Sequence, residues 1–117
     1  QNLFVHPDEI TNWCKKLNLR MCFDISHSML TSNNFGYCFY DFCEQIAPHS
    51  AHLHIGDAKG LNGEGLQIGD GSIDFDKVGK ILKSLAPSAT FIPEIWQGHK
   101  NDGEGFWKAL DLLDNVL

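Results

Sequence analysis

The sequence predicts an α/β fold in which about three parallel strands carry covering helices. Three short apolar segments, residues 20–24, 50–56 and 90–96, have the length and composition of buried strands. Between them lie stretches whose apolar residues recur at helical spacing. Strands joined by single helices must run parallel, because each crossover returns the chain to the same end of the sheet.

The first half of the chain is predicted to open with a helix over residues 7–17. Pro7 suits the first helical turn, two acidic residues follow it, and apolar residues then repeat at helical spacing. A strand over 20–24 follows. The next apolar run predicts a helix over 35–46, which a proline ends, and a strand over 50–56 comes after it.

The second half begins with a glycine-rich loop over residues 61–71. Asp74 is then expected to cap a helix whose apolar stripe starts at Phe75. A third strand is predicted over 90–96 and a final helix over 104–116. The expected core includes the phenylalanines and two tryptophans, Trp13 and Trp107.

Composition and charge narrow the class of protein. With 117 residues and 13.1 kDa, the chain is expected to form a single domain over 1–117. Nine basic against fifteen acidic residues give a net charge of −6, which argues against nucleic acid as a partner. No apolar run reaches the roughly 18 residues of a membrane span, and the N-terminal ten residues do not resemble an export signal. We therefore expect a soluble, cytoplasmic protein without a membrane partner.

The four cysteines fit that compartment. Their spacing matches neither a paired zinc motif nor a redox dithiol. We expect free thiols in a reducing cytoplasm.

Polar side chains gather where the predicted strands end. Asp24, His54 and Glu94 each lie at or near the carboxyl end of a strand, which is the edge where βα folds bind ligands. Two carboxylates and an imidazole suit a divalent ion such as Mn, Co, Mg or Zn. Three protein ligands with open positions are typical of a catalytic metal site.

Each of these residues also has a purely structural interpretation. Asp24 could cap a helix or bind loop amides, and His27 could be a surface residue. His52 is interpreted as a hydrogen-bonded interior histidine. Asp57 could form a loop ion pair with Lys59, which would stabilise little if exposed. His99 follows the third strand and could either close over a substrate or lie in a solvated loop.

Four motifs give the chain a resemblance to a known family. They are D-I-S-H at 24–27, H-L-H-I-G-D at 52–57, I-G-D-G-S-I-D-F at 68–75 and I-P-E-I at 92–95. In these motifs the chain resembles the xylose isomerase-like TIM-barrel superfamily, which includes sugar and sugar phosphate isomerases and epimerases. The resemblance implies a partial (β/α) barrel that corresponds to the C-terminal part of a TIM barrel.

The resemblance also implies roles for individual residues. Asp24, His54 and Glu94 match the metal ligands, and Glu94 is the candidate acid/base. His27 is expected to be catalytic or to touch the substrate, and Lys59 lies in a loop that often binds substrate. The implied function is a metal-dependent isomerase or epimerase of a sugar or sugar phosphate, in which a proton moves through a metal-bound enediolate.

Two departures from the family pattern qualify this function. The family's further metal-binding Glu, one strand earlier, has no counterpart here, and the Asp-x-His of the related endonucleases is missing before the I-G-D-G stretch. A complete barrel takes about 250 residues. We therefore expect part of a longer protein that self-associates or pairs with the missing barrel part. The alternative function is a non-catalytic half-barrel that serves as a binding or assembly module.

Overall fold

The central sheet has three parallel strands. The computed structural model describes residues 5–117; residues 1–4, part of the stretch expected to carry no export signal, lie outside the described residues. Strands β1 (Met21–Asp24), β2 (Ser50–Ile55) and β5 (Thr90–Pro93) pair in the order β1-β2-β5. The parallel pairing confirms the predicted α/β class. The sheet is open, as expected for part of a barrel.

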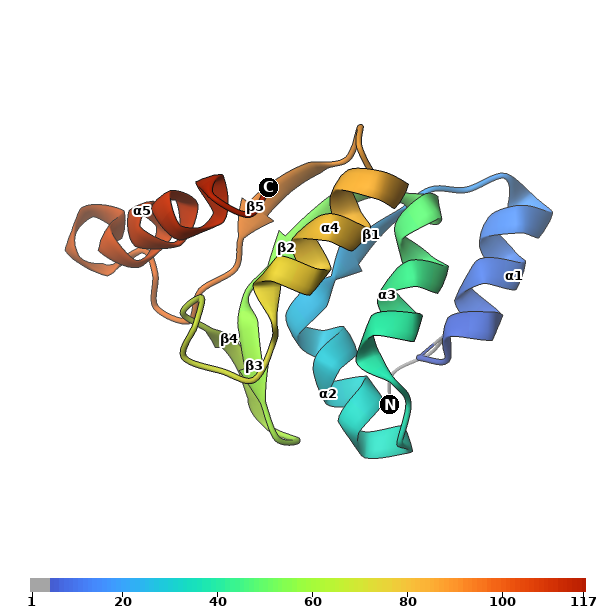
Figure 1. Ribbon diagram of the computed structural model, residues 1–117, viewed down its shortest axis with the longest axis horizontal. Coiled ribbons are helices and arrows are strands. Elements are labelled where there is room, and N and C mark those ends of the chain that lie inside the picture. The colour runs from blue at the N-terminus through green and yellow to red at the C-terminus, as the bar shows by residue number, and fades with distance from the viewer. Residues whose placement is uncertain (1–4) are drawn as a thin grey trace.

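Helices cover one face of this sheet (Figure 1). They are α3 (Phe39–Ile46) and α4 (Phe75–Leu85), with α1 (Pro7–Leu17) beside α3 and a short 3₁₀ turn, η1 (Ala47–His49), before β2. Inward-facing strand residues pack against these helices, which buries a single apolar core. Its members include Phe23, Leu53 and Ile55 from the strands and Phe42, Ile46, Val78 and Leu82 from the helices.

The predicted start of α4 is confirmed in detail. Asp74 has an extended backbone, and its side chain accepts a hydrogen bond from the Lys77 amide. A capping carboxylate satisfies one of the amides that a helix start leaves without a partner. The helix then buries Val78 and Leu82 from the predicted apolar stripe.

A helix that the sequence did not predict follows β1 directly. Residues Ile25–Phe35 form α2, and the helix predicted over 35–46 begins only at Phe39. Besides Ile25, the buried residues of α2 are three serines, Ser26, Ser28 and Ser32. Two of them donate to backbone carbonyls one turn earlier, Ser28 to Asp24 and Ser32 to Ser28. The hydroxyls are thereby satisfied inside the protein.

The glycine-rich segment predicted as a loop over 61–71 contains a strand. Strands β3 (Asp57–Lys59) and β4 (Gly63–Leu66) pair as a small antiparallel hairpin. The hairpin follows β2 directly and contacts α2. It therefore lies at the carboxyl end of the sheet, beside the polar strand ends (Figure 1).

The C-terminal elements also differ from prediction at their ends. Strand β5 stops at Pro93 instead of running to 96, and α5 spans Lys100–Asp114, with its regular part beginning at the predicted residue 104. Its first turn is interrupted by three residues with left-handed backbone, Asn101, Asp102 and Gly103. The two tryptophans expected in the core lie largely outside it: Trp13 is 43% exposed and Trp107 is 64% exposed.

The second face of the sheet carries polar and exposed side chains. Cys22 is exposed, His52 and His54 are half-buried, and Ile92 is 46% exposed. His52 Nδ1 lies 2.7 Å from Thr90 Oγ1, so this histidine is hydrogen-bonded as predicted, although only half-buried. Among the described helices, none has the length and apolar character needed to cross a membrane.

Candidate functional site

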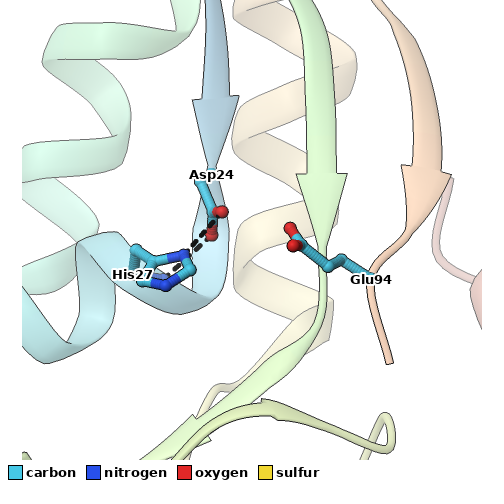
Figure 2. A group of neighbouring side chains, drawn as sticks. All are labelled: Asp24, His27 and Glu94. Atoms are coloured by element: carbon cyan, nitrogen blue, oxygen red, sulfur yellow. Dashed lines mark hydrogen bonds and ion pairs between the residues drawn. The ribbon is translucent and has the colours of Figure 1, made fainter. Parts of the chain in front are cut away.

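Four ionisable side chains converge at the carboxyl end of the sheet. Asp24 ends β1, His54 lies opposite it on β2, and Glu94 follows β5. His54 Nδ1 is 2.9 Å from Glu94 Oε2 and 3.9 Å from Asp24 Oδ2. Asp24, His27 and Glu94 offer ligand atoms that all lie within 4.8 Å of one another (Figure 2). Residues distant in sequence therefore present oxygen and nitrogen donors to one point.

Asp24 has a structural and a site-facing oxygen. Its Oδ1 accepts a hydrogen bond from the His27 amide at 2.9 Å and so caps α2. Its Oδ2 lies 2.6 Å from His27 Nδ1. Asp24 thus does cap a helix, as one interpretation of the sequence held, and its second carboxylate oxygen, Oδ2, still faces the cluster. The N-cap fixes where the carboxylate sits, because the helix start and the strand end are both held in the fold.

The charges of the cluster act on two neighbouring groups. Burial disfavours the imidazolium form of His27, but the hydrogen bond that His27 donates to Asp24 and the negative charges of Asp24, Glu94 and Glu64 outweigh it and raise the pKa of His27. Burial, Asp24 and Glu94 together raise the pKa of the Cys22 thiol. The site thus has a negative local potential, which favours binding of a cation.

Glu94 is held from both sides through the backbone. Its amide donates to the Ile55 carbonyl at 2.9 Å, and the amide of Trp96 donates to the Gly65 carbonyl at 2.7 Å. Both contacts need glycine nearby. A Cβ on Gly56 would lie 2.5 Å from the Glu94 carbonyl oxygen, and Gly65 has a φ of +62° beside Trp96. The hairpin therefore fixes the path of the Glu94 segment.

The hairpin is itself fastened by a buried carboxylate and a buried hydroxyl. Asp57 is fully buried and accepts four backbone hydrogen bonds, from the amides of Ala58, Gly69, Gly71 and Ile73. The interpretation of Asp57 and Lys59 as a loop ion pair is therefore wrong, because the Asp57 carboxylate is buried among backbone amides while Lys59 is exposed. In addition, Ser26 Oγ accepts from the Gly65 amide at 3.1 Å.

A cavity of about 590 Å³ adjoins the cluster. His27 and Glu94 line it at the cluster, and its remaining lining comes from α2, β4 and the segment after β5. The lining residues are Ser26, His27, Glu64, Gly65, Glu94, Ile95, Trp96, Gln97, His99 and Lys100. This volume lies within the range of small-molecule sites.

The structure brings most, but not all, of the predicted site residues together. Asp24, His27, His54 and Glu94 meet, and His99 lies in the wall of the cavity. Lys59 is exposed in the hairpin and does not line the cavity.

The lining residues that sequence reasoning missed include Trp96 and Lys100. Trp96 lies two residues after Glu94, and Lys100 begins α5. The strand was predicted to run to 96, so the turns after Pro93 that bring both residues to the cavity were not expected. Their position in the segment that follows a strand-end carboxylate is the signal that could have identified them.

Comparison with known proteins places the chain in a family. A family model described as xylose isomerase-like TIM barrel matches residues 1–116. A search of curated proteins found no significant match. The family match covers nearly the whole chain and agrees with the resemblance carried by the strand-end motifs.

Proposed function

The chain belongs to the xylose isomerase-like TIM-barrel family, and on that basis we propose that its site serves a metal-dependent isomerase or epimerase of a sugar or sugar phosphate. One observation carries the proposal. Three strand ends bring Asp24, His54 and Glu94 together: His54 Nδ1 lies 2.9 Å from Glu94 Oε2 and 3.9 Å from Asp24 Oδ2, and ligand atoms of Asp24, Glu94 and the adjacent His27 lie within 4.8 Å of one another. Carboxylate and imidazole are the donors that Mn, Co, Mg and Zn use in proteins.

The donor set fits a divalent ion. Asp24 Oδ2, an imidazole nitrogen of His54 and the Glu94 carboxylate would hold it, and His27 lies beside them. When bound, such an ion polarises a carbonyl and stabilises the negative charge of an enediolate. None of these side chains is fully buried, so a ligand can reach them.

The chain's own residues then carry the proton. Glu94 would accept the carbon-bound proton of a hydroxy-ketone on Oε and return it to the neighbouring carbon. The nearby His54 Nδ1, at 2.9 Å from Glu94 Oε2, orients that carboxylate. His27 would contact a substrate hydroxyl through Nε2, since its Nδ1 is hydrogen-bonded to Asp24.

Calorimetric titration with Mn²⁺ tests the proposal. Asp24→Asn removes one carboxylate ligand and should weaken Mn²⁺ binding by at least about tenfold, as loss of even an outer ligand partner does. Asp111→Asn, an exposed position on α5, is the matched control and should leave the affinity unchanged. Equal Mn²⁺ affinities of the two variants, or no binding by the wild type, would reject the metal site.

A second function, a non-catalytic half-barrel that assembles with a further barrel part or a second copy, is favoured by the open sheet. Strands β1 and β5 form its edges, and each has one side without a strand partner among the described residues. Unpaired backbone edges readily add strands. Mn²⁺ binding separates the two functions, because an assembly module has no need of the ligand set.

We also propose the cytoplasm as the location of the protein. The four cysteines are free thiols, and two of them, Cys22 and Cys38, are exposed. Exposed free thiols persist where the compartment is reducing.

A further inference from the structure

The cavity beside Glu94 has a second wall that the proposed proton transfer does not use. Trp96, Gln97, His99 and Lys100 form it, and all four belong to the segment between β5 and the body of α5. Lys100 Nζ donates to Gln97 Oε1 at 3.0 Å. Within residues 5–117, no carboxylate lies within 4 Å of this ammonium group. Its positive charge therefore has no acidic partner in the described chain.

The position of this charge is unusual for the protein. The chain carries a net charge of −6, and the neighbouring cluster at Asp24 and Glu94 is acidic. Lys100 and His99 are the cationic or potentially cationic groups in the cavity wall apart from His27, which is bound to Asp24. A ligand that fills the cavity would therefore contact an acidic cluster at one end and the Lys100 and His99 side chains at the other wall.

Backbone hydrogen bonds and a close approach to α5 define the path of this wall. The Gly98 amide donates to the Ile95 carbonyl at 2.9 Å, and the Lys100 amide donates to the Gln97 carbonyl at 3.0 Å. A Cβ on Gly98 would lie 2.5 Å from the Phe106 ring, so the segment is in close contact with α5. A preformed wall binds a ligand without first losing the conformational freedom of a loop.

We propose, building on the proposed function, that the substrate carries an anionic group, a phosphate or a carboxylate, which binds to Lys100 and His99 while its reacting carbons lie at Glu94. An ammonium group is a compact charge that binds phosphate and carboxylate oxygens well. The substrate class is then a sugar phosphate or sugar acid, and neutral sugars are poor ligands.

Titrations of the metal-free protein, after the chelator has been removed by dialysis, test this proposal, because neither a metal ion nor a polyanionic chelator then competes for the anionic probe. The probes are ribose 5-phosphate, ribonate and ribose, followed through the backbone amide signals of residues 96–100. Both anionic probes, or one of them, should bind about tenfold more tightly than ribose, which is the effect of one charge-assisted contact. The stronger of the two anionic probes identifies the anion as phosphate or carboxylate.

Two lysine variants supply the comparison. Lys100→Gln should reduce binding of the preferred anionic probe about tenfold, to the level of ribose, whereas Lys108→Gln should leave it unchanged. Lys108 is exposed on the same helix and does not line the cavity. Equal binding of ribose and the anionic probes, or equal effects of the two substitutions, would overturn the proposal.

The outcome is separable from that of the proposed function. Anion binding that depends on Lys100 in a protein that does not bind Mn²⁺ would keep the anion site and reject the metal chemistry. Mn²⁺ binding without selective anion binding would do the reverse.

Discussion

Asp57 and Asp24 show two opposite uses of a carboxylate at the same edge of the sheet. Asp57 is fully buried, and both its oxygens accept backbone hydrogen bonds. Asp24 is 26% exposed; one oxygen caps α2, and the other faces His27 and His54. Asp57 has no acceptor capacity left for a ligand, whereas Asp24 does. The surroundings of a strand-end carboxylate therefore separate a structural role from a chemical one.

The largest expected effect is the loss of stability caused by Asp57→Asn. An amide would place N–H groups against backbone donors and leave some of the four amides without an acceptor. The free energy of unfolding should fall by about 4 kcal/mol, because removing one partner of a buried, charge-assisted hydrogen bond leaves the other partner unsatisfied. Urea denaturation measures it. Asp111→Asn is the control, and a loss as small as that control's would contradict the structural role.

The next largest effect contrasts the covered face of the sheet with the open face. Leu82→Ala should cost about 3 kcal/mol in unfolding free energy, because Leu82 is 2% exposed in the core. Ile92→Ala should cost less than about 1 kcal/mol, since Ile92 is 46% exposed on the open face. Urea denaturation of both variants checks this. Equal losses would mean that the open face is covered in solution.

Gly56→Ala links the two regions, because the hairpin that Asp57 fastens also touches Glu94. The added Cβ would lie 2.5 Å from the Glu94 carbonyl oxygen, so the segment must move. We expect Mn²⁺ affinity to fall about tenfold and stability by about 2 kcal/mol. Leu82→Ala is the control, since it destabilises the protein away from Glu94. If both variants keep the wild-type Mn²⁺ affinity in calorimetry, the hairpin does not position Glu94.

The smallest expected change in stability belongs to Asp24→Asn. Asparagine caps helices about as well as aspartate, so α2 should keep its N-cap and the unfolding free energy should change by less than about 0.5 kcal/mol. The same urea measurement as for Asp57→Asn provides the comparison. If Asp24→Asn lowers the unfolding free energy as much as Asp57→Asn does, the main role of Asp24 is structural.

The strands and amphipathic helices were predictable because their buried apolar residues recur at the spacing typical of a strand or a helix. The helix predicted over 7–17 is α1 with the same bounds, and the three strands were found with errors only at their ends. Helix α2 was missed because three of its four buried residues are serines, so the apolar spacing that marks a helix is weak. Strand β4 was missed because its sequence, GEGL, has too little alternation to predict a strand.

The strand-end residues of the site were predictable from topology alone. Parallel strands end at one edge, which brings Asp24, His54 and Glu94 together whatever the length of chain between them. The role of Asp57 was not predicted, because its partners are backbone amides. The one trace they leave in the sequence is glycine, since a Cβ on Gly71 would collide with the Asp57 carboxylate. The cavity wall at Trp96 and Lys100 depends on where β5 ends, and strand ends are the least certain feature of a sequence pattern.

The two sheet edges that have no strand partner within residues 5–117 make protein concentration a variable in every measurement proposed above. Backbone groups pair without regard to side-chain identity, so β1 and β5 can recruit a neighbouring molecule whenever collisions are frequent. Association is detected when the midpoint of urea denaturation rises with protein concentration. A complex that only the folded state forms shifts the equilibrium toward folding. Stabilities compared at one fixed concentration remain comparable among variants.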